Sequence, residues 1–333
     1  MKNQQFKQRM RLLFILLLAG TLLPLSAQKA DKKITEAYKV SNGFTLGVEN
    51  TYGEINITNW DRNEVSVEVT VDVEARSQSK AEAMLDDIEI SISESSNAVY
   101  FETEMDLKII GGQKKINVRY DVKDPDYINV ALEQKYGEVY VQELTGVADI
   151  EIAYGGLVAG RLSPETGSWN SLEMAYGNAD IEQVTALSAE VRYSEITIKR
   201  AGNLEIESAY SEFYLGEVNA IELESKYDKV MLKKLMGSLE IESAYTQVTL
   251  DQLSNRFNEI DAEMTYGNFT AGLEKGVSFD IEAEVVYGSI RIPKGNYSSD
   301  KQGMRQEVKG TVGAGGKSSI TVEMKYGNLS LDD

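Results

Sequence analysis

The chain of 333 residues contains no cysteine and no histidine, and only four prolines. Without cysteine no disulfide can form, so the fold must be held by packing and backbone hydrogen bonds. Without histidine there is no Ser-His or Cys-His nucleophile system, no His-ligated zinc and no usual general base near neutral pH. These absences exclude many common catalytic and metal-binding arrangements.

Long apolar runs are also absent, except for one near the N-terminus. Residues 12–18 (LLFILLL) follow four positive residues and precede a small-residue cleavage site at Ser26-Ala27. This pattern predicts a secretory signal peptide over residues 1–27. The run is shorter than the ~20 residues that span a bilayer, so we expect no transmembrane segment in the mature chain. No cysteine follows it, which excludes a lipid-anchored lipoprotein. The expected location is the periplasm, the outer surface or the medium.

Positive charge is scarce relative to negative charge. The net charge is −19, and −19 less the four positive charges of residues 1–27 leaves −23 on the mature chain. Such a surface repels nucleic acid and favours cations or basic partners. We therefore expect no nucleic-acid partner.

What the chain does contain is a repeat in which a tyrosine precedes a small or turn-forming residue. From Tyr136 to Tyr287 the tyrosines are 17 to 22 residues apart, and the last step, to Tyr326, is 39 residues. That last step equals two coils, or one coil with an insertion. The repeat tyrosines are Tyr52, Tyr136, Tyr154, Tyr176, Tyr193, Tyr210, Tyr227, Tyr245, Tyr266, Tyr287 and Tyr326.

Alignment on these tyrosines reveals apolar columns. The positions three and five residues after the tyrosine, and four before it, are apolar in all eleven repeats. Such alternation predicts strands. A period near 20 is too short for a βαβ unit and fits one turn of a solenoid. The predicted fold is all-β, a right-handed parallel β-solenoid (single-stranded β-helix), in which Ile206, Leu223 and Ile241 lie in neighbouring layers; the hand follows from the bias of parallel crossovers.

The tyrosine and its following residue should form the corner of each coil. The inward-facing residues lie an even number of positions before the tyrosine but an odd number after it. This break in the alternation predicts a residue at positive φ. Glycine fills the second position of the pair in seven of eleven repeats. If the alternation of the preceding strand is continued, the tyrosine falls at an inward-facing position. We therefore expect the rings to pack inside the corner. Tyr140 and Tyr214 fall at outward positions and could contact a ligand.

The segment between the first two tyrosines departs from the repeat. Residues 64–74 alternate as a long strand, and Ser79–Glu82 forms a capping box for a short helix that ends near Asp87. Gly111-Gly112 predicts a turn. Further strands are expected at 88–93, 98–105 and 116–122.

These patterns predict three parts of the chain: the signal peptide (1–27), a small N-terminal α+β cap region (28–124) and a solenoid of about ten Tyr-Gly coils (125–333). The cap would cover the open end of the stack. Residues 295–319 are rich in Gly, Ser and Lys and predict a loop or a degenerate coil.

The pattern resembles the bacterial putative-adhesin family of unknown function, related in style to the head domains of auto-transporter adhesins. The matching pieces are Tyr52-Gly53-Glu54-Ile55-Asn56-Ile57 with Trp60-Asp61, the helix at 81–87, the repeated Tyr-Gly coils, and Gly310–Gly313 leading to Tyr326-Gly327. The resemblance covers nearly the whole mature chain and implies the fold together with a role in adhesion. It implies no catalytic residues. The chain shows no C-terminal membrane barrel of an auto-transporter.

Acidic residues form the sharpest candidate site. The residue three before each tyrosine is glutamate in all eleven repeats, and the residue five before it is acidic in the middle coils. Both positions alternate with inward ones, so we expect two acidic columns on one outer face. The candidate residues for a cation or partner are Glu205, Glu207, Glu222, Glu224, Glu240, Glu242, Asp261, Glu263, Glu282 and Glu284.

Stacked like charges invite counter-charges. Lys135, Arg192, Lys226 and Lys325, one residue before a tyrosine, would supply some of them, and weakly bound calcium would supply more. The alternatives are a solvated face that keeps the sheet soluble and docking of a basic partner. The chain lacks the EF-hand loop and the glycine-rich nonapeptide of calcium-binding β-rolls, so a dedicated calcium site is not expected. No other cofactor is expected.

The sequence thus predicts a non-catalytic exported scaffold for adhesion or surface interaction, with a protein or polysaccharide partner at the cell envelope. The alternatives are an envelope sensor or assembly scaffold, and a carbohydrate-active β-helix enzyme. An enzyme would need an isolated carboxylate pair in one groove, and no coil departs from the pattern to provide one. The sequence leaves the oligomeric state open.

Overall fold

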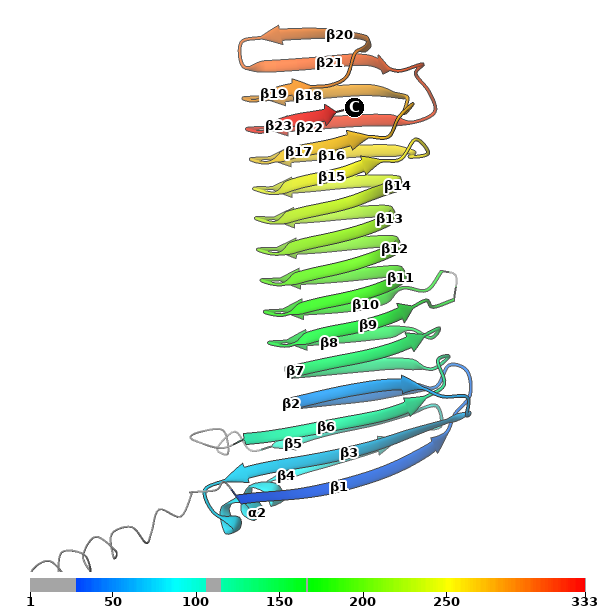
Figure 1. Ribbon diagram of the computed structural model, residues 1–333, viewed down its shortest axis with the longest axis vertical. Helices are drawn as coiled ribbons and strands as arrows, with labels where there is room; N and C mark the ends of the chain where they lie inside the picture. The colour runs from blue at the N-terminus through cyan, green and yellow to red at the C-terminus, as the bar shows by residue number, and fades with distance from the viewer. Residues whose placement is uncertain (1–27, 106–114, 166, 333) are drawn as a thin grey trace, which may run out of the picture.

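The computed structural model describes residues 28–105, 115–165 and 167–332, which form 23 strands of one continuous sheet and one helix. The fold is all-β, as predicted. Figure 1 shows a tall stack of strands with an antiparallel region at each end. The signal-peptide prediction and the Gly111-Gly112 turn lie outside the described residues.

The stack consists of coils that each run into a repeat tyrosine and then continue in a second segment. Between the corners of the middle coils the two segments join into single long strands. The strands of the stack are β2 (Thr45–Asn59), β7 (Asn129–Leu144), β8 (Ala148–Ala153), β9 (Gly156–Leu162), β10 (Asn170–Ala175), β11 (Asn178–Arg192), β12 (Glu195–Ala209), β13 (Glu212–Lys226), β14 (Lys229–Ala244), β15 (Gln247–Leu253), β16 (Glu259–Thr265), β17 (Asn268–Leu273), β18 (Phe279–Val286), β19 (Ser289–Arg291), β22 (Ser319–Lys325) and β23 (Asn328–Asp332).

Neighbouring coils pair in parallel with equivalent residues opposite one another. Ile206 is the partner of Leu223, and Leu223 is the partner of Ile241. The predicted register is therefore confirmed. The hand of the winding stays a prediction.

The core is built from the predicted apolar columns. All eleven residues four before a tyrosine are at most 5% exposed. The columns three and five residues after the tyrosine are also buried, except Ile290 and Ile292 in the Tyr287 coil, which are only partly buried. There β19 is three residues long, so fewer neighbouring side chains cover these two.

The C-terminal coils do not stack in sequence order. β16 pairs with β22, and β22 pairs on its other side with β18. In the same way β23 lies between β17 and β19. The last coil of the chain, which carries Tyr326, is thus inserted between the coils of Tyr266 and Tyr287.

The insertion before this coil is a hairpin. β20 (Gly295–Gln302) and β21 (Arg305–Val312) pair antiparallel, and β21 pairs antiparallel with β18. The predicted loop or degenerate coil at 295–319 is therefore wrong for residues 295–312. The antiparallel hairpin covers the end of the parallel stack (Figure 1).

The N-terminal end is closed in a similar way. β2 pairs in parallel with β7 on one side and with β5 and β6 on the other. Beyond these, β4 pairs antiparallel with β5, and β3 lies antiparallel between β6 and β1. The elements are β1 (Gln28–Lys39), β3 (Glu64–Ala75), α2 (Gln78–Asp86), β4 (Ile88–Glu94), β5 (Ala98–Met105) and β6 (Lys115–Asp124).

The helix α2 begins earlier than predicted. Its N-cap is Ser77, and that side chain makes no capping hydrogen bond. The predicted capping box at Ser79–Glu82 is therefore wrong, because Ser79 already lies within the helix. Ala81 and Met84 are the buried residues of α2. Among the described residues no helix is long and apolar enough to cross a membrane.

Candidate functional site: an acidic face beside a tyrosine ridge

The corner of each coil differs from the prediction. The repeat tyrosines themselves have positive φ, between 52° and 61°, in all eleven coils. Their backbone N–H groups continue the pairing between coils through the corner; for example, Tyr193 donates to Ala209 O at 3.1 Å and Tyr210 to Lys226 O at 3.0 Å. The left-handed conformation rotates the side chain outward, so the parity rule for extended residues does not apply to it.

The rings form an external ridge rather than an internal ladder. Ten of the eleven are 44–54% exposed. Successive rings stack with centroids 4.6–5.1 Å apart and interplanar angles of 2–10°. The prediction that they pack inside the corner is wrong. Because each ring covers the face of the next, the ridge offers edges and hydroxyls to solvent, with few faces free for a sugar.

Glycine follows the tyrosine because neighbouring backbones approach closely there. A Cβ on Gly137 would lie 1.8 Å from Gly53 O, and one on Gly155 would lie 2.0 Å from Gly137 O. In four middle coils a polar side chain takes this place and accepts a hydrogen bond from a backbone N–H of the preceding coil. Asp228 is one of them: its carboxylate accepts from Ser211 N at 2.7 Å and from Ser208 Oγ at 2.6 Å. Burial raises the pKa of Asp228.

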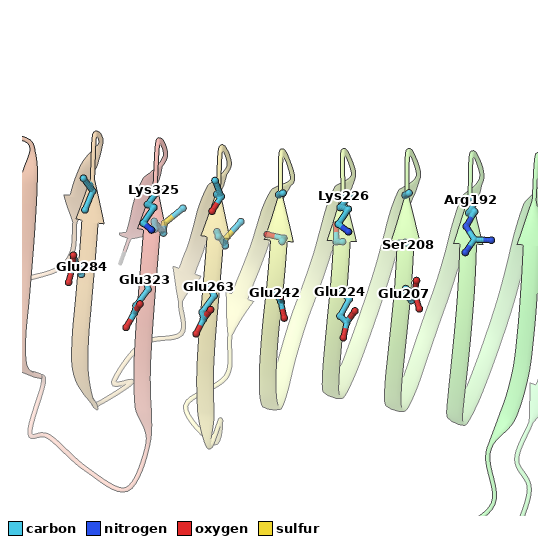
Figure 2. A pocket seen from close by; sticks show the side chains of 18 residues that line it. Arg192, Glu207, Ser208, Glu224, Lys226, Glu242, Glu263, Glu284, Glu323 and Lys325 are labelled. Atoms are coloured by element: carbon cyan, nitrogen blue, oxygen red, sulfur yellow. The ribbon is translucent and has the colours of Figure 1, made fainter.

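One outer face carries the predicted acidic columns. We call the outward side of the strands that run into the tyrosines the acidic face. The glutamates three residues before the tyrosines are direct partners from coil to coil, so they form one unbroken column. Figure 2 shows the part of this column from Glu207 to Glu284. Glu323 stands between Glu263 and Glu284, because the last coil is inserted there.

The glutamate column is longer than the sequence indicates. Glu102 of β5 is the partner of Glu49, and Glu307 of β21 is the partner of Glu284. Neither residue precedes a Tyr-Gly pair, so the alignment could not find them. The alternation in residues 98–105 places Glu102 on an outward face, but it does not set its layer.

The second column, five residues before the tyrosines, is shorter than predicted. Glu205, Glu222, Glu240 and Asp261 are consecutive partners. Thr321 of the inserted coil then separates Asp261 from Glu282. The sequential stacking expected for this column is therefore wrong at its C-terminal end, and Glu282 pairs instead with Lys309 at 2.7 Å.

Counter-charges lie mainly at the two ends of the glutamate column. Lys135 Nζ is 2.5 Å from Glu133, and Arg305 is 2.7 Å from Glu284 and also pairs with Glu307. Near the middle, Arg192 is 3.8 Å from Glu190. Within the described parts of the chain, only Glu133, Glu190, Glu284 and Glu307 of this column form ion pairs. The unpaired members include a continuous run in the middle and C-terminal coils: Glu207, Glu224, Glu242, Glu263 and Glu323. Lys226 and Lys325, which were expected to offset them, form no ion pair there either.

Stacking of the carboxylates affects their protonation. Burial and then the like charge of Glu133 raise the pKa of both Glu49 and Glu151. In the region that the structure describes, no three acidic side chains converge in the way that metal ligands do. Calcium binding by the column would have to use adjacent layers, each supplying one carboxylate.

A groove of about 470 Å³ runs along the unpaired glutamates. It extends from the coil of Arg192 to that of Glu284, and Lys226 and Lys325 also line it (Figure 2). The groove crosses several layers, so a ligand that fills it contacts the same side chain repeatedly.

The opposite outer face, on the strands that follow the tyrosines, carries basic as well as acidic side chains. There the ion pairs join neighbouring coils, such as Arg161 with Glu143 and, at 2.5 Å, Lys199 with Glu182. Tyr140 is 40% exposed on this face, and Tyr214 donates to Glu212 at 2.8 Å. Ion pairs between neighbouring coils are thus a feature of this face, whereas the acidic face carries the run of unpaired glutamates.

No protein-family model and no curated protein matches this chain in sequence. Several solved structures resemble it. A putative cell adhesion protein from Clostridium sporogenes is 12% identical, with 92% of this chain and 99% of that chain covered and a TM-score of 0.21. A putative adhesin from Bacteroides fragilis is 12% identical, with 90% and 97% covered and a TM-score of 0.31.

A third solved structure, a putative lipid binding protein from Parabacteroides distasonis, is 9% identical, with 71% of this chain and 95% of that chain covered and a TM-score of 0.36. Two of these three names agree with the adhesin resemblance noted from the sequence. The identities and TM-scores are low, so the functional argument rests on this chain's own residues.

Proposed function

We propose that the protein is a non-catalytic scaffold of the cell envelope that acts in adhesion or surface interaction through its acidic face. In this proposal the coils wind into a right-handed solenoid, which is the hand that parallel crossovers strongly favour. The partner is a protein or polysaccharide that presents positive charge, directly or through bound cations.

The observation that carries the proposal is the run of unpaired glutamates along the groove. Carboxylates about 4.8 Å apart repel one another. A cationic partner would remove this repulsion at every layer. On the opposite face the protein's own lysines and arginines pair with several of the carboxylates, among them Glu143 and Glu182.

The same geometry argues for binding rather than for catalysis. Acid–base catalysis by two carboxylates requires environments that differ, so that one is protonated and the other charged. In the middle coils each glutamate of the column has glutamates as its neighbours in the layers on both sides. Repeated equivalent groups suit a partner with repeated positive charges.

A retention assay with charge-matched variants tests the proposal. Cell-envelope fractions are passed over beads coated with the mature protein at several salt concentrations, and the envelope material that the beads retain is measured. Replacing Glu207, Glu224, Glu242 and Glu263 with Gln should abolish retention. The matched control replaces four glutamates of the opposite face, Glu138, Glu143, Glu195 and Glu217, with Gln and should retain binding. Equal loss in both variants would show that net charge alone matters, and retention by the first variant would exclude the acidic face.

Export is part of the proposal and has its own test. The pattern of residues 1–27 supports cleavage after Ala27. The protein recovered from the periplasmic or extracellular fraction of a Gram-negative host should begin at Gln28. Recovery of the uncleaved chain in the cytoplasm would contradict export.

A further inference from the structure

A second hollow on the acidic face, far from the tyrosine corners, combines an aromatic ring with carboxylates. It has a volume of about 410 Å³. Trp169 lines it at one end, and the second acidic column lines it along Glu205, Glu222, Glu240 and Asp261. Of the described residues, no lysine or arginine lines this hollow, whereas both line the larger groove.

The chain places Trp169 there through an enlarged connection between β9 and β10. Trp169 immediately precedes β10 and is half-buried. Ala186 lies in the next coil at an outward position, yet it is only 9% exposed. We take the indole to cover it. The following coils have Asn203, Ala220 and Ser238 at the equivalent position, and these small side chains leave the hollow open beside the indole.

The polar groups of the hollow have few partners of their own. Within the residues that the structure describes, the indole nitrogen of Trp169 donates no hydrogen bond, in contrast to that of Trp60, which donates to Glu64 O at 2.6 Å. The four carboxylates of the second column likewise form no ion pair among the described side chains. An aromatic face next to unpaired carboxylates is the arrangement that attracts organic cations.

We propose that this hollow binds a basic peptide segment, with an arginine or lysine head group over Trp169 and further cationic side chains along Glu205, Glu222 and Glu240. Arginine fits best, because its planar guanidinium stacks on an indole and also donates to carboxylates. The inference deepens the proposed function by naming the partner chemistry at one end of the same face. It is tested by peptide binding in solution. The result of that test is independent of whether beads coated with the protein retain envelope components.

The test uses the two tryptophans as separate reporters. The mature protein is labelled with 5-fluorotryptophan, the ¹⁹F resonances are assigned with Trp169→Phe, and triarginine is titrated at low salt. The Trp169 resonance should shift with saturation while the Trp60 resonance stays fixed. A labelled triarginine should bind about fivefold or more weakly to Glu222→Gln/Glu240→Gln, and Trp169→Ala should weaken it by a comparable factor. Glu195→Gln/Glu217→Gln on the opposite face removes the same number of charges as the double variant; it is the matched control and should bind as the unmodified protein does.

Three outcomes would overturn the inference. Equal shifts of both tryptophan resonances would mean diffuse charge attraction. Unchanged affinity in the Trp169→Ala or the double Gln variant would remove the hollow as the site. A shift of Trp169 with an uncharged oligosaccharide, but none with triarginine, would assign the hollow to a neutral glycan instead.

Discussion

At the scale of single residues, the most unusual feature is a tyrosine held at positive φ in every coil. A non-glycine residue in the left-handed region costs about 1–2 kcal/mol. A stacked aromatic pair returns about 0.5–1.5 kcal/mol beyond the area it buries. Each inner tyrosine stacks on two neighbours, as Tyr210 does on Tyr193 and Tyr227. The ridge therefore offsets the backbone strain that the corner requires.

This balance predicts that glycine is tolerated better than alanine at Tyr210, which is the reverse of the usual order within a strand. Both Tyr210→Gly and Tyr210→Ala remove the ring stacking, but only glycine also removes the strain at φ 56°. The glycine variant should be more stable than the alanine variant by about 1 kcal/mol. Urea unfolding midpoints measure the order. A more stable alanine variant would mean that the positive φ is not maintained in solution.

A second residue-scale prediction concerns Asp124, which is completely buried at the end of β6. Asn59 Nδ2 donates to one of its carboxyl oxygens at 3.1 Å, and the other oxygen has no partner among the described residues. Burial raises the pKa of Asp124 from 3.8 to about 8. Because the folded chain holds this proton more tightly than the unfolded chain, the stabilisation is complete below about pH 4. It is lost as the pH rises through about 8.

Asp124→Asn should therefore flatten the decline in stability between pH 5 and pH 9. At pH 9 it should raise the free energy of unfolding by about 1 kcal/mol or more. Urea midpoints at three pH values measure this. Asp61→Asn, at an exposed position, is the control. Parallel pH profiles for the Asp124 variant and the unmodified protein would contradict the assignment.

At the scale of the elements, each coil separates inward from outward positions by one residue. Ile206 is 5% exposed, whereas Glu207 is exposed and has glutamates as partners on both sides. Ile206→Asp should unfold the stack, because an unpaired buried charge costs several kcal/mol. Glu207→Gln should change the stability by no more than about 0.5 kcal/mol, in the stabilising direction. Circular dichroism and size-exclusion elution compare the two variants. Similar behaviour of both would mean that the assignment of Ile206 to the inside and Glu207 to the outside is wrong.

The element scale also shows how far the sequence could predict this fold. Inward and outward columns repeat with every coil, so Ile206, Leu223 and Ile241 could be aligned from their spacing alone. The position of the Tyr326 coil could not, because its columns match those of the Tyr266 and Tyr287 coils equally well. Likewise Glu102 and Glu307 join the glutamate column through pairing that no Tyr-Gly spacing marks.

The candidate site was predictable to a similar degree. Its ten acidic residues could be assigned to one face, but the break at Thr321 depends on the coil order. The tyrosine ridge was placed wrongly because alternation describes extended residues only. Trp169 gave no periodic signal at all, since it follows the enlarged connection between Tyr154 and Tyr176.

At the scale of the whole molecule, a parallel stack has two open ends, and exposed strand edges promote aggregation. Both ends change to antiparallel pairing. β1, β3 and β4 do so at one end, and the β20–β21 hairpin does so at the other. The outermost strand, β20, has mostly exposed, polar residues, among them Asp300 and Lys301. Charged edges of this kind discourage the addition of further strands.

The inserted C-terminal coil joins this closing hairpin to the rest of the stack. Among the strands that the structure describes, β19 pairs only with β23, and β18 pairs only with β22 and β21. Deleting residues 319–333 should therefore leave β18 and β19 without their parallel partners, and the β20–β21 hairpin attached to β18 alone. We expect amide exchange in β18 and β21 to become fast while β11 to β13 stay protected, as hydrogen-exchange mass spectrometry would report. The opposite outcome is also allowed, because the inward and outward residues of the Tyr287 coil match those of the Tyr266 coil. If β18 keeps its protection in the deletion variant, the Tyr287 coil has paired directly with the Tyr266 coil. The inserted coil would then be dispensable for closing the stack.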